Sequence, residues 1–91
     1  MTLDTFHAVV NALKAQGIEA ILEYPGFIQI PIGPTLLNFG DTNETICGEG
    51  IDENGTLIEA FDSKIHRDTE DVQAVADWIK GIHAFAAECV L

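Results

Sequence analysis

Basic residues are scarce in this sequence. Fifteen Asp and Glu stand against four Lys and Arg, which gives a formal net charge of −11 at pH 7. Residues 15–63 contain no Lys, Arg or His. A surface of this charge repels phosphate groups, so we expect no direct binding to nucleic acid. It attracts cationic partners instead and speeds their association.

Long apolar runs are missing as well. No stretch approaches the roughly 18 apolar residues that a membrane span requires. The first ten residues, MTLDTFHAVV, have neither the basic start nor the apolar run of a signal peptide. We therefore expect a cytoplasmic protein without membrane contact. The two cysteines, Cys47 and Cys89, fit no metal or redox spacing, and we expect buried thiols in a reducing compartment.

Side chains suited to catalysis or metal binding are few and poorly placed. The one serine, Ser63, has no G-x-S-x-G context, and the acids Glu44 and Glu49 beside Cys47 disfavour a reactive thiolate. No histidine lies at ligand spacing to a cysteine or to another histidine. No glycine-rich loop is suited to phosphate. The sequence therefore predicts no enzyme, no metal site and no cofactor.

The segment GEGIDENGTLIEAFD, residues 48–62, resembles both a calcium loop and a β-hairpin. With Gly55 at loop position six, Gly50 and Phe61 occupy positions one and twelve, where a calcium loop needs carboxylates. The pair Asn54-Gly55 between apolar residues is typical of a hairpin turn. We therefore predict a hairpin here and no calcium site.

Hydrophobic periodicity predicts a helix, several strands and a second helix. Helical spacing of apolar residues continues to Gly17, which is a candidate C-cap, and Thr2 or Asp4 is suited to cap the start. From residue 18 the period changes to two, and the predicted strands are 18–24, 27–32, 35–40, 44–51 and 56–62, with a turn at Pro25-Gly26. The run 68–71, DTED, is typical of a helix start. We predict one α+β domain over residues 1–91 in two layers: an N-terminal helix, an antiparallel sheet of three to five strands and a long C-terminal helix.

Glycines and aromatic residues add three expectations. Gly48 and Gly50 predict a bulge or a close approach within their strand. Gly81 inside the second helix costs about 1 kcal/mol relative to Ala, so we expect a close contact there. The apolar arc of that helix, which includes Trp78 and Phe85, is wide enough that it must contact the sheet and the first helix, or else a second molecule.

Acidic residues recur at alternate strand positions and in the neighbouring turns. On a rigid sheet they would form a continuous negative face that imitates the charge of a nucleic-acid backbone, although solubility alone is an equally simple explanation. The acids expected to contact a partner are Asp41, Glu44, Glu49, Asp52, Glu53 and Glu59, followed by Glu19 and Glu23.

Several segments resemble small phage and mobile-element proteins: YPGFI at 24–28, FG at 39–40 and NET at 43–45. The layout is similar to that of small acidic anti-CRISPR proteins, and DTEDVQAVADWI at 68–79 resembles the start of the C-terminal helix in a type I-F inhibitor. The resemblance implies a non-enzymatic protein that binds a CRISPR effector complex through acidic side chains and blocks access of DNA or guide. Two alternatives remain open: an immunity protein or antitoxin that neutralises a basic nuclease, and a structural or regulatory homodimer built on Trp78 and Phe85.

Overall fold

The chain folds as one helix, five strands and a second helix. The computed structural model describes residues 1–23 and 26–90, the last of these for its backbone alone. The elements are α1 (Leu3–Lys14), β1 (Ile21–Glu23), β2 (Phe27–Ile32), β3 (Thr35–Gly40), β4 (Thr45–Ile51), β5 (Leu57–His66) and α2 (Val72–Val90). The predicted α+β fold class is confirmed.

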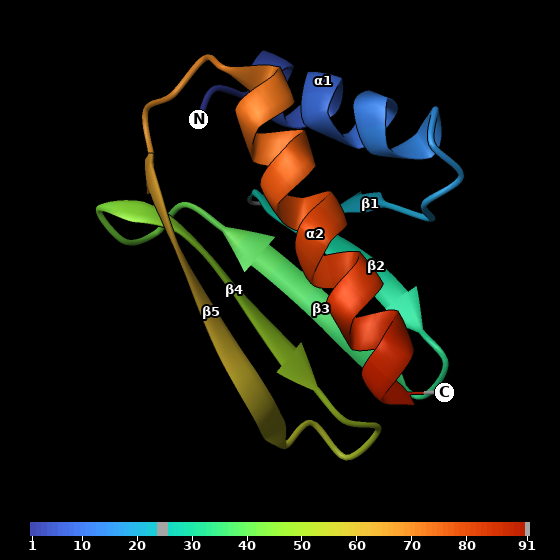
Figure 1. Cartoon of the computed structure of the whole chain (residues 1–91). Helices are drawn as coiled ribbons and strands as arrows, with labels where there is room; N and C mark the ends of the chain where they lie inside the picture. The colour runs from blue at the N-terminus through green and yellow to red at the C-terminus, as the bar shows by residue number, and fades with distance from the viewer. Residues whose placement is uncertain (24–25, 91) are drawn as a thin grey trace.

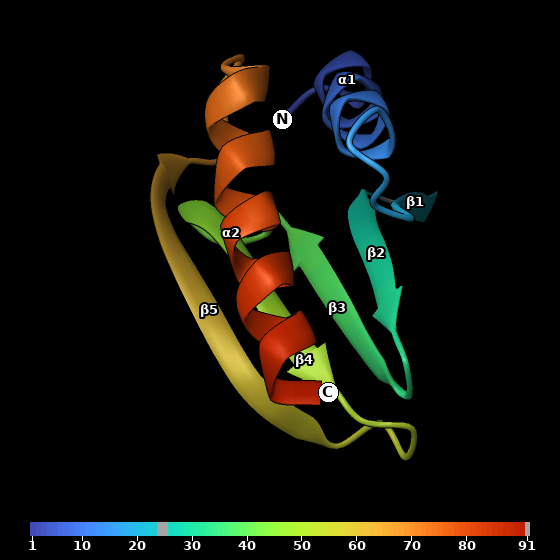
Figure 2. The ribbon, with the colours of Figure 1, turned by 45° about the vertical axis from the view of Figure 1, so that its right-hand side comes forward.

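The five strands form one antiparallel sheet in the order of the chain. Each strand pairs with the next, so that β1 and β5 are the two edges. Both helices lie on the same face of this sheet, with α1 across its β1 end and α2 running along β3 and β4 (Figure 1; Figure 2). We call the face without helices the open face.

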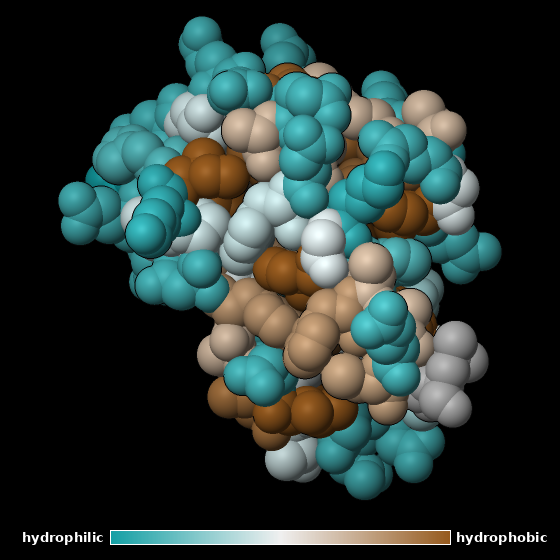
Figure 3. Space-filling view, viewed as in Figure 1, coloured by the Kyte–Doolittle hydropathy of each residue, from teal (hydrophilic) through white to brown (hydrophobic). Residues whose placement is uncertain are grey.

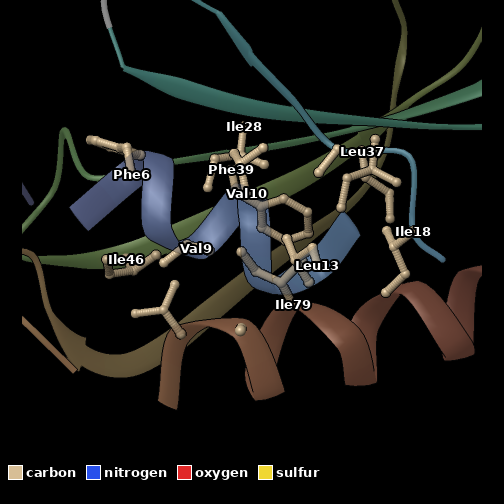
Figure 4. Packing of buried hydrophobic residues seen from close by; sticks show 14 of the residues in the cluster. Phe6, Val9, Val10, Leu13, Ile18, Ile28, Leu37, Phe39, Ile46 and Ile79 are labelled. Carbon is tan, nitrogen blue, oxygen red and sulfur yellow. The ribbon is translucent and has the colours of Figure 1, made fainter. Parts of the chain in front are cut away.

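The core fills the space between the two helices and the sheet (Figure 4). Buried residues alternate along β2 and β3, where Ile28 pairs with Phe39 and Ile30 pairs with Leu37. The Phe39 ring meets Trp78 of α2 edge to face at 5.6 Å between centroids. Since α2 contacts both α1 and the sheet, much of its wide apolar arc is used within the chain, whereas Phe85 in this arc stays 54 % exposed.

Local signals account for the helix ends. Thr2 caps α1, because its Oγ1 accepts a hydrogen bond from the Thr5 backbone N–H at 3.1 Å. The C-cap of α1 is Ala15, and Gly17, the expected cap, has a positive φ of 81° two residues further on. The helix α2 begins at Val72 instead of 68, because the Asp71 carboxylate accepts from the Ala74 N–H at 3.1 Å and so caps the first turn.

The hairpin prediction for residues 48–62 is confirmed. Asp52 Oδ1 accepts hydrogen bonds from the Asn54 and Thr56 N–H groups, both at 2.9 Å, and the Gly55 N–H donates to the Asp52 carbonyl at 3.0 Å. Gly55 has a φ of 79°, a conformation that glycine adopts at little cost. The turn therefore explains both Asn54-Gly55 and one of the acids.

The expected limits of β1 and β5 and one expected contact were wrong. β1 is shorter than predicted, because Ile18 and Ala20 are hydrogen-bonded within the connection from α1. Tyr24 and Pro25 lie outside the described residues, whereas Gly26 of the predicted turn has a positive φ of 140°. β5 continues to His66, beyond a bulge that pairs Thr45 with His66 but Cys47 with Asp62. The contact expected at Gly81 is not there, since a methyl group at this position would meet no atom within 4 Å among the described residues.

Candidate partner-binding surfaces

Two rows of side chains cross the open face of the sheet. Strand pairing places Gln29, Asn38, Glu49 and Ala60 in one row, from β2 to β5. The neighbouring row contains Phe27, Gly40, Cys47 and Asp62. The central residues of both rows are half-buried by their neighbours, although no helix covers them. Sequence analysis did not identify Asn38 or Asp62, because their place beside Glu49 depends on the pairing register.

A polar depression of about 160 Å³ lies on the open face beside the β3–β4 loop. Its lining residues are Phe27, Asn38, Gly40, Thr42, Asn43, Cys47 and Glu49. Asn38 Oδ1 is buried and has no hydrogen-bond partner among the described residues. An acceptor oxygen without a hydrogen-bond partner, next to a carboxylate, is suited to a side chain that only donates hydrogen bonds, such as that of lysine or arginine.

Asp62 accepts two side-chain hydrogen bonds on the open face. The Cys47 thiol donates to its Oδ1 at 3.2 Å and the Thr45 hydroxyl at 2.9 Å. Both hydrogen bonds favour the charged carboxylate and hold the pKa of Asp62 below its ordinary value. The bond from Cys47 has the larger effect and that from Thr45 the next. Asp62 therefore keeps its negative charge to lower pH than an unbonded aspartate.

The predicted acids do not share one continuous face, which corrects that expectation. Glu49 belongs to the open face, whereas Glu59 pairs with Gly50 in the row of Leu37 and lies on the helix side of the sheet. Strand registration causes the difference, since a bulge between Gly50 and Ile51 shifts the pairing of β5.

Two of these acids have partners inside the chain. The Asp41 carboxylate accepts a hydrogen bond from the Met1 amino group, and Asp52 holds the β4–β5 turn as described above. The others are exposed or line the depression: Glu19 and Glu23 near the β1 edge, Glu44 in the β3–β4 loop and Glu53 in the β4–β5 turn. Asp41 and Asp52 are therefore less available to a partner than Glu44 or Glu53.

The chain does not neutralise its own carboxylates. Two ion pairs link described residues, that of the Met1 amino group with Asp41 and that of His66 with Asp68 at 3.7 Å. Among the described residues, no Lys or Arg nitrogen lies within 4.0 Å of a carboxylate oxygen. The negative charge is therefore left to solvent, counterions or a partner.

An apolar groove of about 400 Å³ lies between the C-terminal half of α2 and the lower ends of β3–β5 as drawn in Figure 1. Its lining residues are Pro34, Thr35, Leu37, Gly50, Ile58, Glu59, Phe61, Phe85, Ala86 and Cys89. Cys89 is exposed here and Cys47 is half-buried, so the expectation that both thiols are buried was wrong.

The two aromatic residues of the expected dimer face have different environments. Trp78 is partly buried against the core through its contact with Phe39. Phe85 is 54 % exposed and meets Phe61 edge to face at 6.5 Å between centroids. Of the pair, Phe85 is the one that a second molecule would reach.

The described residues contain no group of three His, Cys, Asp or Glu side chains that could hold a metal ion. Within the same residues, no helix is both long and apolar enough to cross a membrane. No family model, curated protein or solved structure matches this chain.

Proposed function

We propose that this chain is a non-enzymatic inhibitor that binds a cationic, nucleic-acid-binding surface of a partner protein. A CRISPR effector complex is the partner that the sequence resemblance implies. The observation that carries the proposal is the unneutralised charge: fifteen acids are present, and none in the described residues is paired with Lys or Arg. Binding to a cationic surface would therefore break no such pair within this chain.

Rigid placement supports the same proposal. Glu49 and Glu59 lie on paired strands, and Glu53 lies in a turn that three hydrogen bonds to Asp52 hold in place. Carboxylates on a rigid sheet lose little backbone entropy when a partner binds, in contrast to acids on a disordered tail. Their effect should be largest on the association rate and should weaken as salt screens the charges.

Charge reversal at three exposed or half-exposed acids tests the proposal. The variant combines Glu49→Lys, Glu53→Lys and Glu59→Lys, and the matched control combines Asp68→Lys, Glu70→Lys and Asp77→Lys at acids that are all exposed. Both variants have the same net charge, so a difference between them reports where the charge lies. The assay is inhibition of DNA binding by a purified type I CRISPR effector complex, with association rates measured at two salt concentrations.

We expect the parent protein and the control to inhibit, and the first variant to lose at least about tenfold in affinity, equivalent to about 1.4 kcal/mol. Circular dichroism should show that both variants remain folded. Equal inhibition by the parent and the first variant would contradict the role of these acids. A basic nuclease in place of the effector complex tests the immunity-protein alternative in the same format.

A further inference from the structure

The groove beside Phe85 leaves apolar side chains exposed on the helix side of the fold. Figure 3 shows apolar surface gathered over the C-terminal half of α2 and the adjoining strand ends. Phe85 is 54 % exposed and Ile58, across the groove on β5, is 57 % exposed. Exposed large apolar residues in one hollow are typical of an interaction site.

The charges at the same end of the molecule are negative. Glu59 lines the groove, and no Lys, Arg or His is among the described residues that form its wall. The β4–β5 turn, which carries Asp52 and Glu53, leads directly into Leu57 and Ile58. Figure 1 shows this turn beside the C-terminal end of α2. An apolar hollow with an acidic rim is complementary to apolar side chains flanked by cations.

We propose that this groove binds a basic amphipathic helix of the partner protein, with apolar side chains seated between Ile58 and Phe85 and a Lys or Arg beside Glu59. The inference rests on the proposed function for the charge of the partner, and it adds the segment that is recognised. Helices of this kind bind grooves through apolar residues spaced at one face, while cations on the flanks pair with the rim. The groove volume is within the range of pockets that hold a few large side chains or a small ligand.

Charge also argues against a second copy of this chain as the occupant. Each copy has a formal net charge of −11, and Glu59 at the groove of one copy would meet a second, equally acidic molecule. Like charges brought together at an interface oppose association. A basic helix is favoured instead, because its cations reduce the repulsion among the acids at the groove end of the molecule.

Three fluorescent model peptides of 18 residues provide the probes. The first is an amphipathic helix of Leu and Lys, the second replaces each Leu by Ser, and the third replaces each Lys by Glu. Fluorescence anisotropy with the intact protein reports binding of each. We expect the Leu/Lys peptide to bind at least about tenfold more tightly than either of the others, because only it matches both the groove and the rim.

Substitutions in the protein locate the site. The combination of Phe85→Ser and Ile58→Ser should lower the affinity for the Leu/Lys peptide to that for the Ser/Lys peptide. The matched control combines Leu3→Ser and Ile21→Ser, at residues that are 62 % and 51 % exposed away from the groove, and should change the affinity less than about twofold. Glu59→Gln should weaken binding and flatten its salt dependence.

The possible failures are distinguishable. Equal binding of the Leu/Lys and Ser/Lys peptides would overturn the groove proposal and leave the proposed function standing. Tighter binding of the Leu/Glu peptide than of the Leu/Lys peptide would overturn both the groove proposal and the proposed function. It would show that the acids of this protein do not favour a cationic partner over an acidic one. Sedimentation of the protein alone as a dimer, dissociated by the Phe85→Ser and Ile58→Ser pair, would assign the groove to a second copy and overturn the proposal.

Discussion

The Phe39 ring lies directly over the backbone of Gly48, so a Gly48→Ala substitution tests how tightly the centre of the sheet is packed. The added methyl group would lie 2.5 Å from Cδ1 and 2.6 Å from Cε1 of Phe39, well inside van der Waals contact. Phe39 has almost no freedom to move away, because it is 1 % exposed and its ring also packs edge to face with Trp78. The substitution must therefore displace the ring, the strand or α2.

Overpacking of a core in this way costs about 1–3 kcal/mol of the free energy of unfolding. We expect a loss of about 2 kcal/mol, which in a domain of this size lowers the melting temperature by roughly 8–16 °C. Urea unfolding should be followed by far-UV circular dichroism and by the fluorescence of Trp78. Trp78 is the single tryptophan and contacts the ring under test, so its emission should also change in the folded state.

Two other glycines of the sheet provide matched controls. At Gly50 the added methyl group would lie 3.6 Å from Leu37 Cδ2, an ordinary contact, so Gly50→Ala should be neutral or stabilise by up to about 1 kcal/mol. At Gly40 it would lie 2.8 Å from the Phe27 ring, which is half-exposed on the open face and can turn aside. Gly40→Ala should therefore cost less than Gly48→Ala. If Gly48→Ala costs no more than Gly50→Ala, the argument from rigid packing is refuted.

Two further predictions concern the polar contacts. The folded-state pKa of Asp62 is lowered, so its hydrogen bonds stabilise the fold above the ordinary pKa of aspartate, and this stabilisation is lost as pH falls toward the folded-state value. Cys47→Ala should raise the pKa of Asp62 toward its ordinary value in an NMR titration of the carboxyl carbon, and an unchanged pKa would contradict the assigned cause. Thr2→Ala should destabilise by about 1 kcal/mol in thermal unfolding, because it removes the cap of α1, whereas Thr2→Ser, which keeps the hydroxyl, should cost little.

The strands that end at clear turn residues could be predicted from the sequence. β2 and β3 have the predicted limits of 27–32 and 35–40, since both alternate cleanly and end at glycine-containing turns. The close approach at Gly48 was also predictable, because a glycine in a buried strand needs a neighbour that uses the space. What the sequence did not contain was the position of the β5 bulge, which depends on how Ser63 and Ile65 bond to each other.

The arrangement of the acids could not be predicted either, because it also depends on how the strands pair. Alternation assigns faces only within one strand, and relative faces of two strands depend on the pairing register. The bulge between Gly50 and Ile51 places Glu59 on the helix side, away from Glu49. The orphaned oxygen of Asn38 was likewise invisible, because its burial comes from residues on the neighbouring strands.

Charge and apolar surface act together at the end of the molecule that contains the groove. An apolar hollow bounded by Phe85 and Ile58 would by itself favour self-association, and the net charge of −11 opposes that association at low salt. The same charge favours a basic helix, so it selects among partners that the apolar contact alone would accept. Raising the salt concentration from 0.1 M to 1 M shortens the screening length from about 10 Å to about 3 Å and removes both effects. The specificity that we propose for the groove is therefore an electrostatic property, whereas the affinity that remains at high salt would measure the apolar contact.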